Sequence, residues 1–336
     1  MFQSFYLSRR WLLWSSAGAV LILLVTWYKV QLDVRINEWF GDFYNLVQKA
    51  LSKPNTITLN EYLEQLTTFG TIAGLYVTVA VFTDFFIKHY VFRWRTAMTE
   101  YYAAHWHTLR AVEGASQRVQ EDTMRFARLV EGLGVSFMRS VMTLFAFLPI
   151  LWTLSEKITE LPWVGPINHS LVWVAIAFAL AGTVLMAGVG IKLPGLEFEN
   201  QRVEAAFRKE LVYGEDDWTR ATTARSGALF GDVRRNYFRL FFHYMYFDVA
   251  RYAYLQFGVL VPYIALGPTL VAGVITLGVM QQIVRAFGRV ESSFQYLVSS
   301  WTTIVELISV YKRLRTFERR IGVAAAHGHH QASPAN

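Results

Sequence analysis

Cysteine is absent from the 336-residue sequence. Its absence excludes disulfide bridges, thiolate nucleophiles and cysteine-ligated metal sites within these residues. The sequence also lacks the G-x-x-x-x-G-K-S/T loop with which P-loop ATPases hold phosphate groups. We find no nucleophile spaced to meet a general base, and no pair of carboxylates placed for acid–base catalysis. We therefore expect a protein that is not an enzyme and that needs no metal or cofactor.

Apolar residues are abundant by contrast. The sequence is 54% hydrophobic and 16% aromatic, with 11 Trp, which is more than a soluble domain of this length needs. The first apolar run, Trp11–Val30, is about 20 residues long, and it exceeds the apolar core of a cleavable signal peptide. No small-residue cleavage site follows it. The composition therefore predicts an integral membrane protein whose first span is this run.

The apolar residues fall into six segments long enough to cross a bilayer, at residues 11–30, 66–87, 134–154, 171–193, 237–266 and 271–311. We expect residues 1–320 to form a single all-α membrane domain with six transmembrane helices. The remaining residues, 321–336, are rich in alanine, histidine and glycine, and this composition predicts a disordered cytoplasmic tail.

Positive charge is concentrated in two long segments, Arg93–Glu131 and Pro194–Asn236. The other loops are poorer in Lys and Arg, and Lys157 is the only such residue between the third and fourth spans. By the positive-inside rule, both termini and both long segments lie in the cytoplasm. Both segments continue the helical pattern of their spans, so we expect long cytoplasmic helical extensions. We assign the net charge of +7 to this bias and not to nucleic-acid binding.

A stripe of carboxylates begins where the fourth apolar segment ends. At about 100° per helical residue, Glu204 lies about 20° from Glu197, and Glu215 returns to almost the same direction. Glu131, where the first long segment enters the third span, is a further acid near the predicted membrane boundary. Two interpretations are open for these acids. They line a polar passage and take up protons, or they form ion pairs with arginines such as Arg208.

A second polar stripe runs along the sixth apolar segment. Its members recur at steps of three and four residues: Gln282, Arg285, Arg289, Ser292, Tyr296, Ser299, Thr303 and Glu306. Ionisable side chains at membrane depth usually face a cavity or one another. The alternative is that Arg285 and Arg289 pair with Glu291 or with a carboxylate of a neighbouring helix.

Several longer motifs resemble known transporters. The segment Gly114–Phe126, GASQRVQEDTMRF, resembles the N-x-D-Q-R-I-x-E-D segment of D-type ABC half-transporters, and Asn200–Glu210, NQRVEAAFRKE, resembles their E-E-I-A-F-Y motif. The SbmA/BacA family of bacterial inner-membrane peptide transporters is more similar. HYVFRWRTAMTEYY, GIKLPGLEFENQRVEAAFRKELVYGEDD and SWTTIVELISVYKRLR all resemble that family. The resemblance covers nearly all of residues 27–317.

The resemblance implies an ABC-exporter-like transmembrane fold without a nucleotide-binding domain. It implies a homodimer that imports peptides and peptide-like antibiotics across the bacterial inner membrane, driven by protons. The expected proton-coupling or cavity-lining residues are Glu131, Glu197, Glu204, Glu215, Arg285, Arg289 and Glu306. The main alternative is the membrane subunit of an ABC transporter energised by a separate ATPase chain. A third is a structural or lipid-organising protein with no transport cycle.

Overall fold

The structure is a computed structural model of residues 1–336, and it describes residues 1–110, 112, 115–158 and 160–331. The regular elements within these ranges are helices, apart from one bridge between Leu161 and Gly165. The chain forms two compact units, Met1–Val172 with Leu266–Asn336 (unit 1) and Trp173–Ala265 (unit 2). The predicted all-α class is confirmed.

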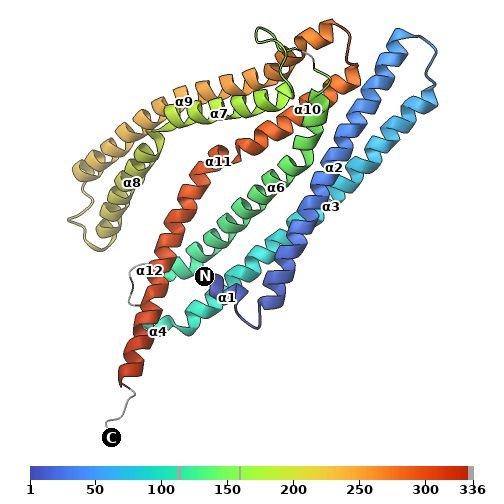
Figure 1. The fold of residues 1–336 in the computed structure, drawn as a ribbon. Coiled ribbons are helices and arrows are strands. Elements are labelled where there is room, and N and C mark those ends of the chain that lie inside the picture. The colour runs from blue at the N-terminus through green and yellow to red at the C-terminus, as the bar shows by residue number, and fades with distance from the viewer. Residues whose placement is uncertain (111, 113–114, 159, 332–336) are drawn as a thin grey trace. The chain divides into compact units, whose positions relative to one another are not determined.

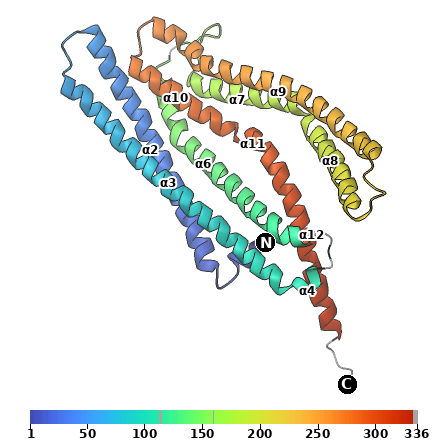
Figure 2. The ribbon, with the colours of Figure 1, turned by 180° about the vertical axis from the view of Figure 1, so that it is seen from behind.

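Unit 1 is built around long helices. Its elements are α1 (Phe2–Tyr6), α2 (Leu12–Ser52), α3 (Leu59–Ala104), α4 (Trp106–Leu109), α5 (Ala115–Gln117), the π-helical turn η1 (Arg118–Asp122), α6 (Thr123–Ser155), α10 (Leu277–Phe294), α11 (Tyr296–Ser299) and α12 (Trp301–Gln331). Figure 1 and Figure 2 show α2, α3 and α6 side by side, and α10 packs against both α2 and α6.

The hairpin of α2 and α3 is closed by local chemistry. The Thr58 hydroxyl accepts a hydrogen bond from the Glu61 backbone N–H at 3.2 Å, and the Glu61 carboxylate accepts one from the Thr58 N–H at 2.7 Å. This reciprocal pair satisfies two of the free N–H groups at the start of α3. Below the turn, Trp39 Nε1 donates to the Gln65 carbonyl at 2.8 Å and joins the two helices.

An aromatic core lies at the end of unit 1 that holds the N-terminus. Phe5 of α1 stacks on Trp94 of α3 with ring centroids 5.7 Å apart, and both side chains are buried. Phe126 of α6 and Phe317 of α12 are buried in the same cluster. Complete burial of one such side chain stabilises a fold by about 1.5–3 kcal/mol. This core therefore fixes four helices to one another.

Unit 2 contains the charged stretch of the second long segment. It includes most of α7 (Ser170–Gly190), all of α8 (Leu193–Asp216) and most of α9 (Thr223–Val271). The Tyr254 ring of α9 stacks on Phe178 with centroids 4.6 Å apart. It fills the space over Gly182, where a Cβ atom would lie 2.2 Å from the Tyr254 ring. A glycine at this position therefore allows α7 and α9 to pack closely.

Five helical stretches among the described residues are long and apolar enough to cross a membrane: Leu12–Ser52, Leu59–Ala104, Ala115–Ser155, Ser170–Asp216 and Thr223–Val271. The integral membrane class agrees with the prediction, although the helices extend well beyond the predicted spans. Helix α2 continues past the predicted end of the first span as far as Ser52. The fifth span continues past its predicted end at residue 266 to Val271.

The predicted sixth span, 271–311, does not form one continuous apolar helix. The chain forms α10, α11 and α12, with interruptions at Gln295 and Ser300. Helix α10 is amphipathic, and its buried residues Ile283, Phe287 and Val290 recur at helical spacing. Its polar face carries the arginines, so its composition falls short of an apolar span. Helix α12 continues to Gln331, so the described part of the predicted disordered tail is helical; residues 332–336 lie outside the described ranges.

Candidate functional site

Three helices of unit 1 bring charged side chains together around Asp33 of α2. The Asp33 carboxylate is 5% exposed. It accepts a hydrogen bond from Arg289 Nη2 of α10 at 2.8 Å, and Arg139 Nη2 of α6 lies 3.7 Å away. One acid therefore faces two guanidinium groups, and the contacts join α2, α6 and α10. We call Asp33, Arg139 and Arg289 the Asp33 cluster.

Two further cations lie beside the Asp33 cluster. The Arg285 guanidinium stacks over the Phe40 ring at 4.0 Å from its centroid. Its Nε is buried without a hydrogen-bond partner in the described part of the chain. Lys29 Nζ lies 5.8 Å from the Tyr76 ring centroid, and the Tyr76 hydroxyl accepts from Arg139 Nη2 at 3.3 Å. The site is therefore rich in positive charge that aromatic faces help to accommodate.

Arg285 and Arg289 were predicted either to face a cavity or to pair with a carboxylate, and the structure gives the two arginines different partners. Arg289 pairs with a carboxylate of a neighbouring helix, as one alternative stated, whereas Arg285 stacks on an aromatic ring. Asp33 was missed as a site residue, because it lies beyond the predicted end of the first span, residues 11–30. A signal for it was present: Lys29 and Asp33 are four residues apart on one helical face that follows an apolar run.

Glu131 of α6 is half-buried, and it is not part of the Asp33 cluster. The charged group that interacts with its carboxylate is Asp84 of α3, a second acid. Within the described ranges it forms no ion pair and no hydrogen bond, so the interpretation that an arginine pairs with it is wrong for Glu131. A half-buried carboxylate beside another acid favours the protonated form more than an exposed one does.

Helix α8 carries the predicted carboxylate stripe on one unbroken helix. Glu197 accepts a hydrogen bond from the Tyr244 hydroxyl of α9 at 2.7 Å. Glu204 is half-buried and Glu215 is exposed, and neither forms an ion pair or hydrogen bond among the residues described. Arg208 is exposed and bridges neither acid. The interpretation that arginine pairing holds this stripe is therefore wrong for Glu204 and Glu215.

Glu210 of the same helix has the opposite environment, and sequence reasoning missed it. It is 5% exposed, with Arg225 Nε at 3.1 Å and Arg220 Nη2 at 3.6 Å. It also accepts a hydrogen bond from the Ala221 backbone N–H at 3.2 Å. These contacts close the turn between α8 and α9. The signal available was the pair of arginines that follow the acid in sequence.

Glu306 of α12 lies in a short chain of charges with α6. It accepts from Arg125 Nε, and Arg125 Nη1 lies 3.6 Å from Glu121, which is four residues earlier on the chain. Asp122 pairs with an arginine that is distant in sequence. Arg313 donates twice to Asp122, at 2.8 and 2.9 Å, and these hydrogen bonds raise the pKa of Arg313.

Charged groups inside long apolar helices, held by one another or left without a partner, are typical of membrane transporters. The comparisons place the chain in that class. The SbmA/BacA-like family matches residues 8–322, and the chain belongs to it. This confirms the resemblance inferred from the motifs.

The curated relatives are longer proteins. The chain is 25% identical over 324 residues to "Inner membrane ABC transporter ATP-binding protein YddA" of Escherichia coli (strain K12), covering 89% of this chain and 56% of that protein. It is 24% identical over 332 residues to an uncharacterized ABC transporter ATP-binding protein of Synechocystis, covering 93% and 47%. It is 23% identical over 312 residues to "ABC transporter D family member 2, chloroplastic" of Arabidopsis thaliana, covering 85% and 40%. The chain spans about half the length of the relatives it matches.

Proposed function

We propose that two copies of this chain form a proton-driven importer of peptides and peptide-like antibiotics in the bacterial inner membrane. Six spans cross the bilayer, with both termini in the cytoplasm, and the sixth is formed by α10–α12. Membership of the SbmA/BacA-like family supports transport as the activity. The observation that carries the proton coupling is a contrast among the acids of the described residues. Asp33, Asp122 and Glu210, which are the most buried, are paired with arginines, whereas Glu131, Glu204 and Glu215 form no ion pair there.

Proton coupling requires acids that change charge during the cycle. Burial and neighbouring carboxylates favour the neutral form, whereas a guanidinium partner would hold an acid ionised. Glu131 meets the first condition, because it is half-buried and acted on by Asp84, whereas Asp33 and Glu210 each contact two arginines. A proton that falls through about 100 mV releases about 2.3 kcal/mol, so one or two protons suffice for modest accumulation.

A dimer follows from the surface that one copy leaves open. No more than 28% of the apolar window of any candidate span is buried within the chain. Lipid can cover the apolar part of this surface, but it cannot cover the polar stripe of α10 at membrane depth. A two-fold dimer that encloses a water-filled cavity would hydrate that stripe. A cavity with acidic and aromatic lining suits cationic peptides of varied sequence, because acids attract cations and aromatic faces accept many shapes.

Glutamine substitution tests the proposal. Glu131→Gln, Glu204→Gln and Glu215→Gln keep the size of the side chain and remove its titration. We expect peptide uptake into liposomes under an imposed pH gradient to fall severely for Glu131→Gln and Glu204→Gln, with melting temperatures near wild type. Glu121→Gln is the matched control, since Glu121 is exposed and already paired with Arg125. Wild-type uptake in all three variants would remove these acids from the mechanism.

The second candidate function is the membrane part of an ATP-driven transporter. The printed names of the relatives, which describe ATP-binding ABC transporter proteins, favour it. The same liposomes distinguish the two. Uptake driven by the pH gradient without nucleotide supports the proton-driven importer, whereas uptake that requires ATP and an added ATPase chain supports the ABC subunit.

A further inference from the structure

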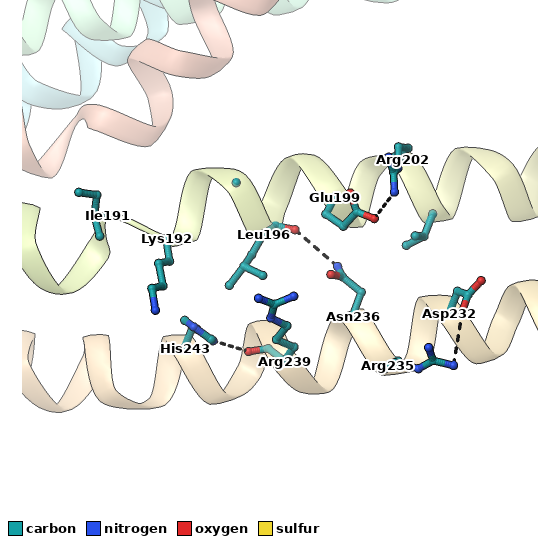
Figure 3. A pocket seen from close by; sticks show the side chains of 12 residues that line it. Ile191, Lys192, Leu196, Glu199, Arg202, Asp232, Arg235, Asn236, Arg239 and His243 are labelled. Carbon is teal, nitrogen blue, oxygen red and sulfur yellow. Dashed lines mark hydrogen bonds and ion pairs between the residues drawn. The ribbon is translucent and has the colours of Figure 1, made fainter.

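A groove of about 800 Å³ lies between α8 and α9 of unit 2, shown in Figure 3. One end of the groove lies where α7 ends. Helix α7 contains no charged residue, and Lys192 is the first cation after it. The groove therefore lies where an apolar stretch gives way to charge, which in a membrane protein is the level of the lipid headgroups.

The charges that line this groove do not balance. Its two carboxylates each have an arginine of their own: Arg202 Nη2 lies 2.6 Å from Glu199, and Arg235 Nη2 lies 3.6 Å from Asp232. Lys192 is also part of the lining, and its side chain forms no ion pair or hydrogen bond among the described residues.

Arg239 is the second cation of the groove without a counter-ion in the described ranges. His243 Nδ1 lies 2.9 Å from the backbone carbonyl oxygen of Arg239, and this contact does not involve the guanidinium group. In Figure 3 the side chains of Lys192 and Arg239 both extend between the two helices. The groove therefore presents two positive charges to whatever occupies it.

The remaining lining consists of apolar residues together with Asn236 and His243. Leu196 and Val203 line the groove beside the charges, and Ile191 at its end is 75% exposed. An aliphatic side chain this exposed at the end of an apolar helix is suited to contact with a lipid acyl chain. A cationic peptide would be repelled by the surplus positive charge. The lining thus favours a ligand with an anionic head and an apolar tail.

We propose that this groove binds the headgroup phosphate of an anionic phospholipid, between Lys192 and Arg239, with an acyl chain along Ile191. Lysine acts as a point charge toward phosphate, and arginine can donate two parallel hydrogen bonds to its oxygens. Basic pockets between helices at the cytoplasmic surface of a membrane are suited to such headgroups.

Native mass spectrometry of the detergent-purified protein tests this. It is titrated with phosphatidylglycerol, with phosphatidylcholine of the same acyl chains, and with glycerol 1-phosphate. We expect wild type to prefer phosphatidylglycerol, and Lys192→Gln with Arg239→Gln to reduce that preference by about twenty-five-fold, since each cation contributes about fivefold. The matched control is Lys209→Gln with Arg234→Gln, which removes the same charge from exposed positions of α8 and α9 outside the groove.

A steric variant keeps the test independent of charge. A Cβ atom at Gly195, which lines the groove, meets no atom within 4 Å, so Gly195→Leu can fill the space without disturbing the helices. It should also lower phosphatidylglycerol binding. Equal affinity for the two lipids in wild type, or an equal loss in the control variant, would overturn the proposal. Displacement of the lipid by equimolar glycerol 1-phosphate would assign the groove to a free phosphate ester instead.

Discussion

Asp33 of α2 and Glu204 of α8 are both acids on long helices with an arginine two residues away in sequence. The structure gives them opposite surroundings. Asp33 is 5% exposed and contacts two arginines from other helices. Glu204 is half-buried and contacts none among the described residues. The number of nearby arginines in sequence therefore does not decide whether an acid is neutralised.

The packing of each helix explains the difference. Helix α2 is in contact with α3, α6 and α10, so side chains from several directions reach Asp33. In unit 2, the contacts that carry α8 come from α9, through Leu240, Tyr244 and Asn236. One face of α8 is thereby left without a partner inside its unit.

The largest effect on stability should come from Asp33→Asn. This change leaves Arg289 and Arg139 without the carboxylate between them. We expect a loss of about 3 kcal/mol in the free energy of unfolding, at the lower end for a buried pair because both arginines are partly exposed. Denaturant titration in detergent measures it. Asp232→Asn, in an exposed pair with Arg235, should cost less than about 1 kcal/mol. Equal losses would contradict the distinction between the two surroundings.

An intermediate effect is expected within α8 itself. Glu210→Gln removes the charge that Arg220 and Arg225 share, and we expect a loss of about 1–3 kcal/mol. Glu215→Gln on the same helix should change stability by less than about 0.5 kcal/mol, because its side chain is exposed and makes no such contact. Melting temperatures of the two variants side by side give the comparison. A destabilised Glu215→Gln would show that the carboxylate stripe of α8 contributes to the stability of the fold.

The smallest effect concerns pH. The Thr219 hydroxyl and backbone N–H donate to Asp217 at 2.6 and 2.9 Å, and both hold the pKa of Asp217 below its ordinary range. Because the folded pKa is lowered, this contribution is present above about pH 4 and is lost as the pH falls through the folded pKa. The stability difference between wild type and Asp217→Asn should stay constant between pH 5 and 7 and shrink below about pH 4. A difference that changes between pH 5 and 7 would show that another group titrates there.

The sequence was sufficient for the all-α membrane class and for α8 as one unbroken helix, because apolar length and helical periodicity are local properties. It was not sufficient for the partners. Arg289 lies 256 residues from Asp33 in the chain, and Arg313 lies 191 residues from Asp122. Periodicity places a side chain on a face of its own helix, but only packing determines which other helix meets that face.

The interruptions near Gln295 and Ser300 show a second limit of prediction from the sequence, which is where a helix is broken. Neither proline nor glycine occurs between Arg289 and Val305 to predict them, and the polar stripe continues across both. The repeat of polar residues therefore predicted one helix where the chain forms three. The sequence was equally unable to show that Glu204 forms no ion pair among the described residues, because Arg208 lies one turn away on the same helix.

The turn between α2 and α3 offers a position at which the orientation of this hairpin in the membrane can be measured. Residues 53–56 are exposed, and the reciprocal bonds of Thr58 and Glu61 fix the start of α3 without depending on Lys53. Since the sequence has no cysteine, Lys53→Cys supplies the sole thiol within these 336 residues. The side of the bilayer on which a membrane-impermeant maleimide reaches that thiol is a direct reading of the orientation of the hairpin.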